Sequence, residues 1–328
     1  KKRRMQFGLE PNREPKEHYE GNEDLLWCRI RQTLQEPFSE FLGILLYTMI
    51  AQGGVAQATL SVGEKTAPGG NGFGSYLTVP FVTGIGVMMG VYVAGDSGSY
   101  LNPAITIANS LFRGLPWRTL PALTLAQLLG AFVGTAITFG IYKPAIDMYS
   151  GGALLVSPTP QATASIFTSF PQTFETRTSQ VFSVIQRNAI LQIVISALKD
   201  DLNLGQRVSA GGGNMFPLNL FFIFFALESA TGWETSGQSN PAFDLGSRIM
   251  LSCLGYPKEI WTTSGGYPWI PVIMPIVGSC FGAWLYDVFV FTGASPVNTP
   301  YLGLSKFAKP SLDYSNRRER YEQRLDEG

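Results

Sequence analysis

Long apolar segments alternate with short polar connections along most of the chain. Because an α-helix rises about 1.5 Å per residue, six of these segments are long enough, or nearly so, to cross roughly 30 Å of hydrocarbon. They comprise residues 38–60, 76–94, 120–142, 181–198, 217–231 and 269–291. Two further apolar runs, 104–112 and 242–254, are too short to cross. The pattern predicts an all-α membrane protein with six transmembrane helices and two re-entrant half-helices.

The two short runs share their first residues. Each begins at an Asn-Pro-Ala tripeptide that follows an apolar segment; the residues are Asn102, Pro103, Ala104, Asn240, Pro241 and Ala242. Asparagine is favoured at the N-cap of a helix and proline at its first position, so each tripeptide predicts a helix start. Two short helices that start at membrane depth are typical of a pore.

The two halves of the chain repeat each other. Residues 40–43 (EFLG) open the first apolar segment, and residues 184–187 occupy the matching place in the fourth. LGAFVG (129–134) in the third segment matches VGSCFG (277–282) in the sixth. With three crossings each, the halves must have opposite orientations in the membrane, which is a transport architecture. The glycine pairs Gly130/Gly134 and Gly278/Gly282 are expected to allow close helix packing.

Charge is concentrated at the two ends of a chain whose formal net charge is zero. Residues 1–36 and 309–328 hold more than half of the charged residues, and six crossings place both ends on one side. Arg113, Arg118, Lys199 and Arg207 fall in loops on that side, so the positive-inside rule predicts that both termini are cytoplasmic. The Gly-rich and Ser-rich loops 63–74 and 151–177 should then be extracellular. The basic start lacks a signal-peptide core and is expected to be retained. The expected location of the protein is the plasma membrane.

The expected organisation has five parts. They are a cytoplasmic tail (1–36), the first channel half (37–143), an extracellular connection (144–178), the second channel half (179–292) and a second cytoplasmic tail (293–328), within which 313–324 could form a helix.

The composition argues against catalytic chemistry. The single histidine, His18, lies in the polar tail, and the three cysteines are too scattered for a disulfide framework. No nucleophile with a base, and no cluster of metal ligands, can be assembled from the apolar body. We therefore expect no enzyme activity, no cofactor, no metal and no nucleic-acid partner.

The paired tripeptides, the repeat and the opening EPFSEFLG (36–43) resemble the major intrinsic protein family, the aquaporins and aquaglyceroporins. Within it the chain is most similar to fungal aquaglyceroporins, through GIGVMMGVYVAGDSGSYLNPA (84–104), GWETSGQSNPA (232–242) and WLYDVFVFTGASPVNTPYLGL (284–304). The resemblance covers about residues 27–305. It implies one pore per protomer, a homotetramer in the lipid bilayer, and Asn102 and Asn240 directing their side-chain amides at small neutral solutes.

The selectivity ring that the resemblance implies departs from the family at four positions. Thr83 (or Val82, with a one-residue gap) stands where aquaglyceroporins usually carry Trp, and Glu228 where Gly is expected. Gly237 replaces an aromatic residue, and Phe243 replaces an Arg. Smaller side chains at two positions should widen the passage, and the missing Arg removes five donors and a charge that repels cations.

Two further residues are candidates for supporting this ring. Glu40 is expected to accept backbone N–H bonds from the first re-entrant loop. The family's second such carboxylate is replaced by Val184, but Arg187 lies three residues on and on the same helix face. Arg187 and Glu228 should lie at similar depth, which suggests that they pair at the ring; the alternative is that Arg187 extends to the outer interface.

The combined prediction is a passive channel for small uncharged polar solutes. Glycerol and larger polyols are the expected cargo, with water, urea and protonated weak acids as further candidates. Two alternatives remain: a channel for ammonium or other monovalent cations, and a closed or structural membrane protein in which Phe243 blocks the passage.

Overall fold

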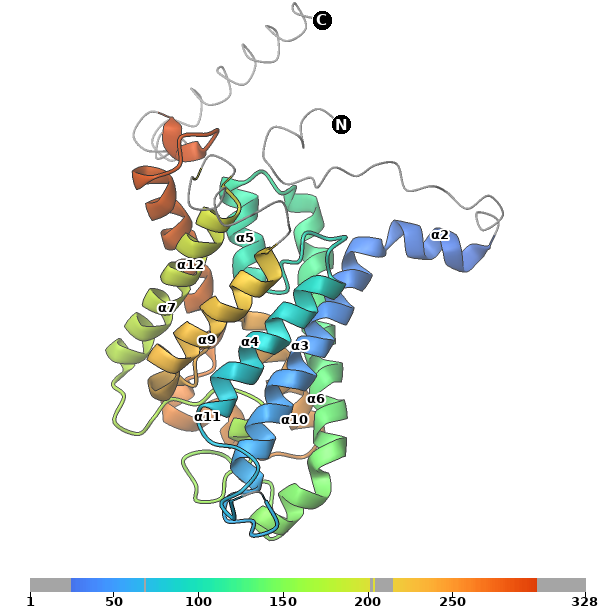
Figure 1. Ribbon diagram of the computed structural model, residues 1–328, viewed down its shortest axis with the longest axis vertical. Helices are drawn as coiled ribbons and strands as arrows, with labels where there is room; N and C mark the ends of the chain where they lie inside the picture. The colour runs from blue at the N-terminus through green and yellow to red at the C-terminus, as the bar shows by residue number, and fades with distance from the viewer. Residues whose placement is uncertain (1–24, 68, 201–202, 204–214, 300–328) are drawn as a thin grey trace, which may run out of the picture.

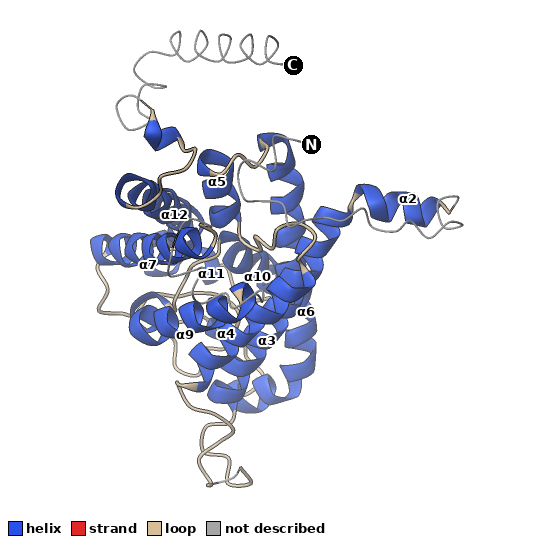
Figure 2. Cartoon of the chain, turned by 45° about the horizontal axis from the view of Figure 1, so that its top comes forward, coloured by secondary structure: helices blue, strands red, loops and turns tan. Residues whose placement is uncertain are grey.

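The computed structural model describes residues 25–67, 69–200, 203 and 215–299. His18, Arg207 and the segment 313–324 lie outside the described residues. Within the described ranges the regular structure is helical, without β-strands (Figure 2). Most helices run roughly along the long axis of the molecule and pack side by side (Figure 1).

Six long helices correspond to the six predicted apolar segments. They are α3 (Gln35–Leu60), α4 (Thr78–Val93), α6 (Leu120–Ser150), α7 (Arg177–Leu198), α9 (Phe216–Thr235) and α12 (Trp269–Phe289). Five of them are long and apolar enough to cross a membrane. The exception, α4, has 16 residues and a length of about 24 Å. It is shorter than the predicted segment 76–94.

The predicted end of the third segment is too early. The helix α6 runs past residue 142, contains Pro144 and ends at Ser150. The next residue, Gly151, has the left-handed conformation (φ 67°) common after helices. Lys143 and Asp147 form an ion pair one helical turn apart in this extension. Residues 144–150 therefore belong to the helix rather than to the predicted connection 144–178.

The two half-helices start where the tripeptides predict. The helix α5 (Pro103–Phe112) has Asn102 as its N-cap, and α10 (Pro241–Cys253) has Asn240. In both helices the cap oxygen accepts backbone N–H bonds of the first turn, from Ala104 in α5 and from Ala242 in α10. Start signals in the sequence thus fix both helix origins.

Four glycines bring the long helices together in a repeated pattern. A Cβ atom added at Gly130 or Gly134 of α6 would press on the carbonyl oxygen of Phe41 or Leu45 in α3, respectively. The equivalent additions at Gly278 and Gly282 of α12 would press on the carbonyl oxygens of Ile185 and Ala189 in α7. Phe41 follows Glu40 as Ile185 follows Val184, so the predicted alignment of the halves is reproduced by the packing.

Several short elements complete the described fold. They are α2 (Leu26–Thr33), η1 (Trp117–Thr119), η2 (Ala164–Ile166), α11 (Glu259–Gly266) and η3 (Pro296–Asn298), of which the sequence analysis expected none. The helix α2 lies within the predicted tail 1–36 and extends away from the bundle at the same end as η3 (Figure 1).

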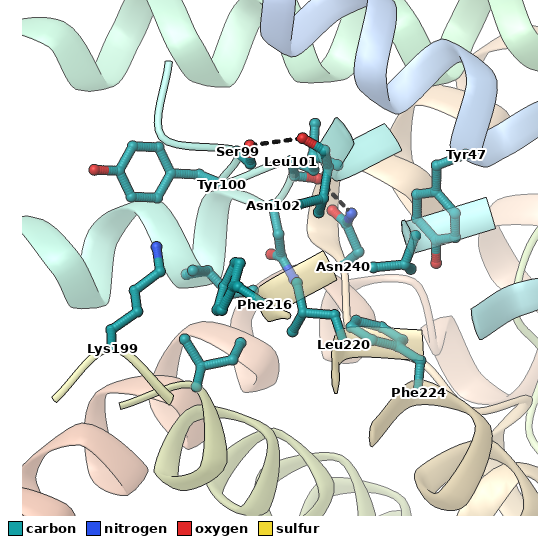
Figure 3. Close-up of a pocket in the computed structure, with 14 residues that line it drawn as sticks. Tyr47, Ser99, Tyr100, Leu101, Asn102, Lys199, Phe216, Leu220, Phe224 and Asn240 are labelled. Atoms are coloured by element: carbon teal, nitrogen blue, oxygen red, sulfur yellow. Dashed lines mark hydrogen bonds between the residues drawn. The ribbon is translucent and has the colours of Figure 1, made fainter. Parts of the chain in front are cut away.

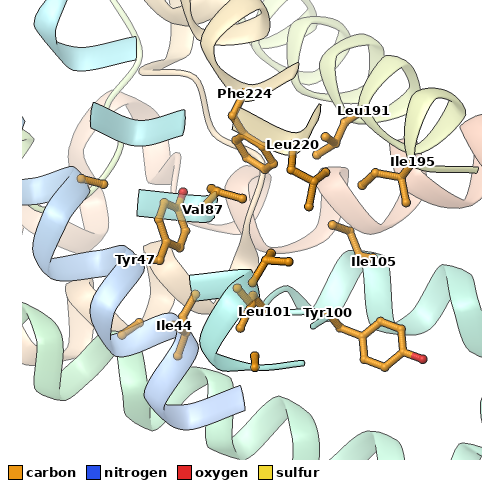
Figure 4. Close-up of a cluster of buried hydrophobic side chains, with 14 of the residues drawn as sticks. Ile44, Tyr47, Val87, Tyr100, Leu101, Ile105, Leu191, Ile195, Leu220 and Phe224 are labelled. Atoms are coloured by element: carbon orange, nitrogen blue, oxygen red, sulfur yellow. The ribbon is translucent and has the colours of Figure 1, made fainter. Parts of the chain in front are cut away.

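A cluster of buried apolar side chains surrounds the meeting point of the half-helices. Ile44 of α3, Val87 of α4, Leu191 of α7, and Leu220 and Phe224 of α9 contribute to it (Figure 4). These side chains come from both halves of the chain. The cluster therefore holds the two halves together around the re-entrant segments.

Candidate pore and constriction

The asparagines that cap the two half-helices lie face to face. The amide nitrogen of Asn102 donates to the carbonyl oxygen of Ser239 at 2.7 Å, and that of Asn240 donates to the carbonyl oxygen of Leu101 at 2.7 Å. Each asparagine thus fixes the loop that precedes the other. The two helix origins are held together by a reciprocal pair of hydrogen bonds.

This arrangement leaves donors available to a solute. A side-chain amide has two N–H groups, and one of each pair is used in the reciprocal bonds. Both asparagines also line a cavity, together with Tyr47, Leu220 and Phe224 (Figure 3). Because helix N-termini carry partial positive charge, the cavity wall offers donors and a positive potential next to an apolar face. Such a wall suits a hydroxyl-bearing neutral molecule.

The first re-entrant loop is supported by Glu40, as predicted for this buried carboxylate. It accepts the backbone N–H groups of Tyr100 (2.8 Å) and Leu101 (2.6 Å) and the side-chain amide of Gln127 (2.7 Å). Leu101 has a positive φ of 52°, which is uncommon for a residue with a side chain. The carboxylate therefore holds a loop conformation that the backbone alone would disfavour.

The second re-entrant loop is supported by a cation instead. Arg187 of α7 is 1% exposed, and its Nη2 lies 2.6 Å from Oε2 of Glu228 in α9, so the pair suggested by the sequence is present. Its Nε donates to Oγ of Ser239 at 2.6 Å, and its Nη1 donates to the carbonyl oxygen of Leu227 at 2.7 Å and to Oγ1 of Thr231 at 2.8 Å. The alternative in which Arg187 extends to the outer interface is excluded by this burial.

The first loop presents backbone N–H donors, which a carboxylate accepts, whereas the second loop presents oxygen acceptors, to which a guanidinium donates. Residues 237–239 offer oxygens: Asn188, next to Arg187, donates to the carbonyl oxygen of Gln238 at 3.2 Å. Val184, at the position matching Glu40, is fully buried in an apolar cluster with Tyr267 and Ile270. Loop support has therefore moved by one helical turn and reversed its polarity in the second half.

Glu228 and Gly237 are structurally coupled. Gly237 has a left-handed φ of 60°, and a Cβ atom added there would overlap the Glu228 carboxylate. The carboxylate thus occupies the space that an aromatic side chain at 237 would need. The small size of Gly237 therefore leaves no empty space beside it on the side of Glu228.

The remaining ring candidates occupy different environments. The ring of Phe243 is partly buried and lies 5.1 Å from that of Tyr47, centroid to centroid. Val82 packs against Gly54 of α3, and the next residue, Thr83, is partly buried. The contact of Val82 places it in the interface of α3 and α4.

Sequence reasoning missed Tyr47 and gave no pore role to Lys199, and both line the cavity. Tyr47 lies seven residues after Glu40, which is about two helical turns and hence the same face of α3. That spacing from a predicted loop-supporting residue was the available signal. For Lys199 the sequence offered only its place just after an apolar segment.

Comparison with known proteins places this geometry in a family. Residues 28–286 match the family model described as "MIP: Major intrinsic protein". The chain belongs to the major intrinsic protein family. Because the matched region spans most of the chain, the predicted membership and the all-α membrane fold with two re-entrant half-helices are confirmed.

Fungal members of the major intrinsic protein family are among the relatives of the chain. It is 44% identical to aquaglyceroporin-9 of Botryotinia fuckeliana over 88% of its own length, and it spans 61% of that protein. It is also 44% identical to probable aquaglyceroporin-2 of Gibberella zeae, over 88% of the chain and 82% of the relative. The X-ray structure of the aquaglyceroporin from Plasmodium falciparum superimposes with a TM-score of 0.66 at 26% identity, over 78% of this chain and 96% of that one.

Proposed function

We propose that the protein is a passive channel for small uncharged polar solutes, with glycerol and somewhat larger polyols as the main cargo. The observation that carries this proposal is the cavity lined by Asn102 and Asn240, whose amides hold each other's loops and retain donors for a solute. The names of the fungal relatives point to the same solute class. Transport of this kind requires no cofactor and no energy source.

We assign the constriction to Thr83, Glu228, Gly237 and Phe243, with Arg187 as its support. Val82 is set aside because it packs between helices. Typical relatives carry an Arg directly after the second tripeptide. In this assignment Arg187 of α7 takes its place, and its charge is balanced by the ion pair with Glu228. A neutral ion pair at the ring favours hydroxyl-bearing solutes over ions, since an ion would lose its hydration without a compensating charge.

The proposal extends to assembly and placement. By the family resemblance, four protomers form a homotetramer in the lipid bilayer of the plasma membrane, each with its own pore. Arg113, Arg118 and Lys199 face the cytoplasm, as the positive-inside rule requires. Residues 61–77 and 151–176 then face the outside.

The test is solute permeation in proteoliposomes that contain the full chain. Stopped-flow shrinkage is followed in hyperosmotic glycerol, erythritol and sorbitol. Protein-free liposomes of the same lipid provide the baseline. With glycerol and erythritol, the volume should recover much faster in vesicles that contain the protein than in protein-free liposomes. With sorbitol, the recovery should be slower than with these two solutes. Permeability to water alone would contradict the solute assignment, and rates equal to the baseline for every solute would contradict a channel.

A further inference from the structure

A lysine borders the same cavity, on the side where Tyr100 lies (Figure 3). Lys199 directly follows α7, and among the described residues that line the cavity it is the one that carries a charge. Figure 3 shows Lys199 beside Tyr100, with Tyr47 and Phe224 across the cavity and the two asparagines between. A solute that travels between this side and the asparagines therefore passes the ammonium group.

The contacts of this ammonium are aromatic. Its Nζ lies 4.8 Å from the centre of the Phe216 ring and 5.4 Å from that of Tyr100. Ring faces attract a cation without neutralising it. The four ion pairs found among the described residues involve Arg113, Lys143, Arg187 and Arg248, and Lys199 belongs to none of them. Among the described residues, no carboxylate in contact cancels the positive charge of Lys199.

Other ionisable groups surround this position. Glu40 of α3 acts on Lys199 through space, Tyr100 provides a phenol, and the neighbouring Asp200 accepts a hydrogen bond from Oη of Tyr286 at 2.8 Å. Burial lowers the pKa of Lys199 to about 8, and the charge of Glu40 opposes that shift. The ammonium is consequently the predominant form at neutral pH and is lost as the pH rises through about 8.

The constriction, by contrast, provides no unmatched positive charge. Phe243 stands directly after the second tripeptide, and Arg187 is matched by Glu228 at 2.6 Å. Repulsion of cations must then come from the ends of α5 and α10 and from whatever charge borders the path elsewhere. Lys199 is the described side chain that meets this requirement.

We infer that Lys199 is a charge-selectivity residue, whose ammonium keeps monovalent cations out of the cavity while neutral polyols pass. This inference rests on the proposed channel function and adds to it a residue that separates neutral from cationic solutes. A unit charge a few ångströms from the path, in a medium less polar than water, changes the local population of a monovalent cation by tenfold or more, on the order of magnitude given by Coulomb's law.

The experiment compares cation and glycerol flux in the same proteoliposomes. Lys199→Gln removes the charge, Lys199→Glu reverses it, and Lys199→Arg retains it as the matched control. Uptake of radiolabelled methylammonium and potassium should rise about tenfold or more for the Gln and Glu variants, with Glu the larger, and stay at the wild-type level for Arg. Glycerol flux in the same vesicles reports that each variant is folded and open. The ratio of cation uptake to glycerol uptake should rise for the Gln and Glu variants and stay at the wild-type value for Arg.

A pH series on the wild-type protein provides a second readout that needs no charge-removing variant. Raising the pH from about 7 to about 9.5 neutralises Lys199 and should increase the uptake of potassium, whose charge does not depend on pH. The Lys199→Arg protein should show no increase, because arginine stays protonated. Any response that arises from Glu40, Tyr100 or Asp200 would persist in the Arg variant and would count against the inference.

The outcomes of the two proposals are separable. Cation uptake that stays at the wild-type level in Lys199→Glu and Lys199→Gln, with normal glycerol flux, would overturn the inference and leave the polyol channel intact. Absence of glycerol flux in the wild type would overturn the proposed function. If Lys199→Glu alone loses glycerol flux, the Gln variant and the pH series decide.

Discussion

Arg187 and Glu228 form a buried ion pair in which each side chain is the charged partner of the other. Both side chains are almost fully buried, and the guanidinium uses three nitrogens on four acceptors. Arg187→Ala would leave the Glu228 carboxylate without its cation and would remove the guanidinium donors to Ser239 and Thr231, whereas the Leu227 carbonyl would keep the hydrogen bond from Oγ1 of Thr231. Removing one member of a buried pair typically costs about 3–5 kcal/mol, so we expect a large loss of thermal stability in detergent and a loss of polyol flux.

A double-mutant cycle provides the control for this prediction. Replacing both members in Arg187→Met with Glu228→Leu removes the unpaired charge, and the double variant should be clearly more stable than the sum of the single losses implies. Arg187→Lys should rescue only part, since an ammonium cannot reproduce the planar set of donors. A wild-type melting temperature and normal flux in Arg187→Ala would refute the supporting role.

Some contacts of Arg187 and Glu228 could be predicted from the sequence, and others could not. Counting depth along two helices was sufficient to suggest that Arg187 meets Glu228. The coupling of Glu228 to Gly237 was not accessible, because it depends on a left-handed turn at Gly237. Nor was the bond from Arg187 to Thr231, where the backbone of α9 leaves helical geometry (φ −138°). Local departures from regular structure position these side chains, and no sequence period encodes them.

Among the helices, the positions of two glycines in α6 predict different effects of the same substitution. Gly130 of α6 faces the backbone of α3, whereas Gly140 of the same helix has no atom within 4 Å of an added Cβ. Gly130→Ala should push α6 from α3 and destabilise the protein by about 1–3 kcal/mol, the range for overpacking. Gly140→Ala should be neutral or stabilising, because alanine costs less backbone entropy in a helix.

The measurement is thermal unfolding of both variants in one detergent, followed by tryptophan fluorescence, with glycerol flux as a second readout. Gly278→Ala in α12 should behave like Gly130→Ala, since it meets the equivalent carbonyl of α7. Equal melting temperatures for Gly130→Ala and Gly140→Ala would show that close packing of α6 on α3 contributes little to stability.

Element boundaries were predictable where the chain carries an explicit start signal, or where an apolar run stops sharply, as at the ends of α3 (Leu60) and α7 (Leu198). Asn102 and Asn240 fix the starts of α5 and α10 because asparagine followed by proline suits a helix start and little else. The end of α6 was missed because hydrophobicity stops near residue 142 while the helix continues, supported by the Lys143–Asp147 pair. In α6, polar residues extend the helix beyond the apolar run, so hydropathy alone misses its end.

Across the whole bundle, the two ends differ in the elements and the charged residues that they carry. The helix α2, the start of α6 and η3 gather at one end, and the loop that joins α3 to α4 lies at the other (Figure 1). The cationic residues Arg113, Arg118 and Lys199 follow the ends of α5 and α7 and precede α6. Six crossings and the positive-inside rule then require the first end to be cytoplasmic.

Thiol labelling can decide this orientation. The three native cysteines, Cys28, Cys253 and Cys280, are first changed to serine to give a background without thiols. Lys65 and Arg118 are both exposed and lie in connections on opposite sides of the bundle, so Lys65→Cys and Arg118→Cys form a matched pair. In intact cells, a membrane-impermeant maleimide should label Lys65→Cys fully and Arg118→Cys only after permeabilisation. The reverse pattern would place the charged tails and Lys199 on the outside of the cell, whereas the effect of Lys199 on cation flux would be unchanged.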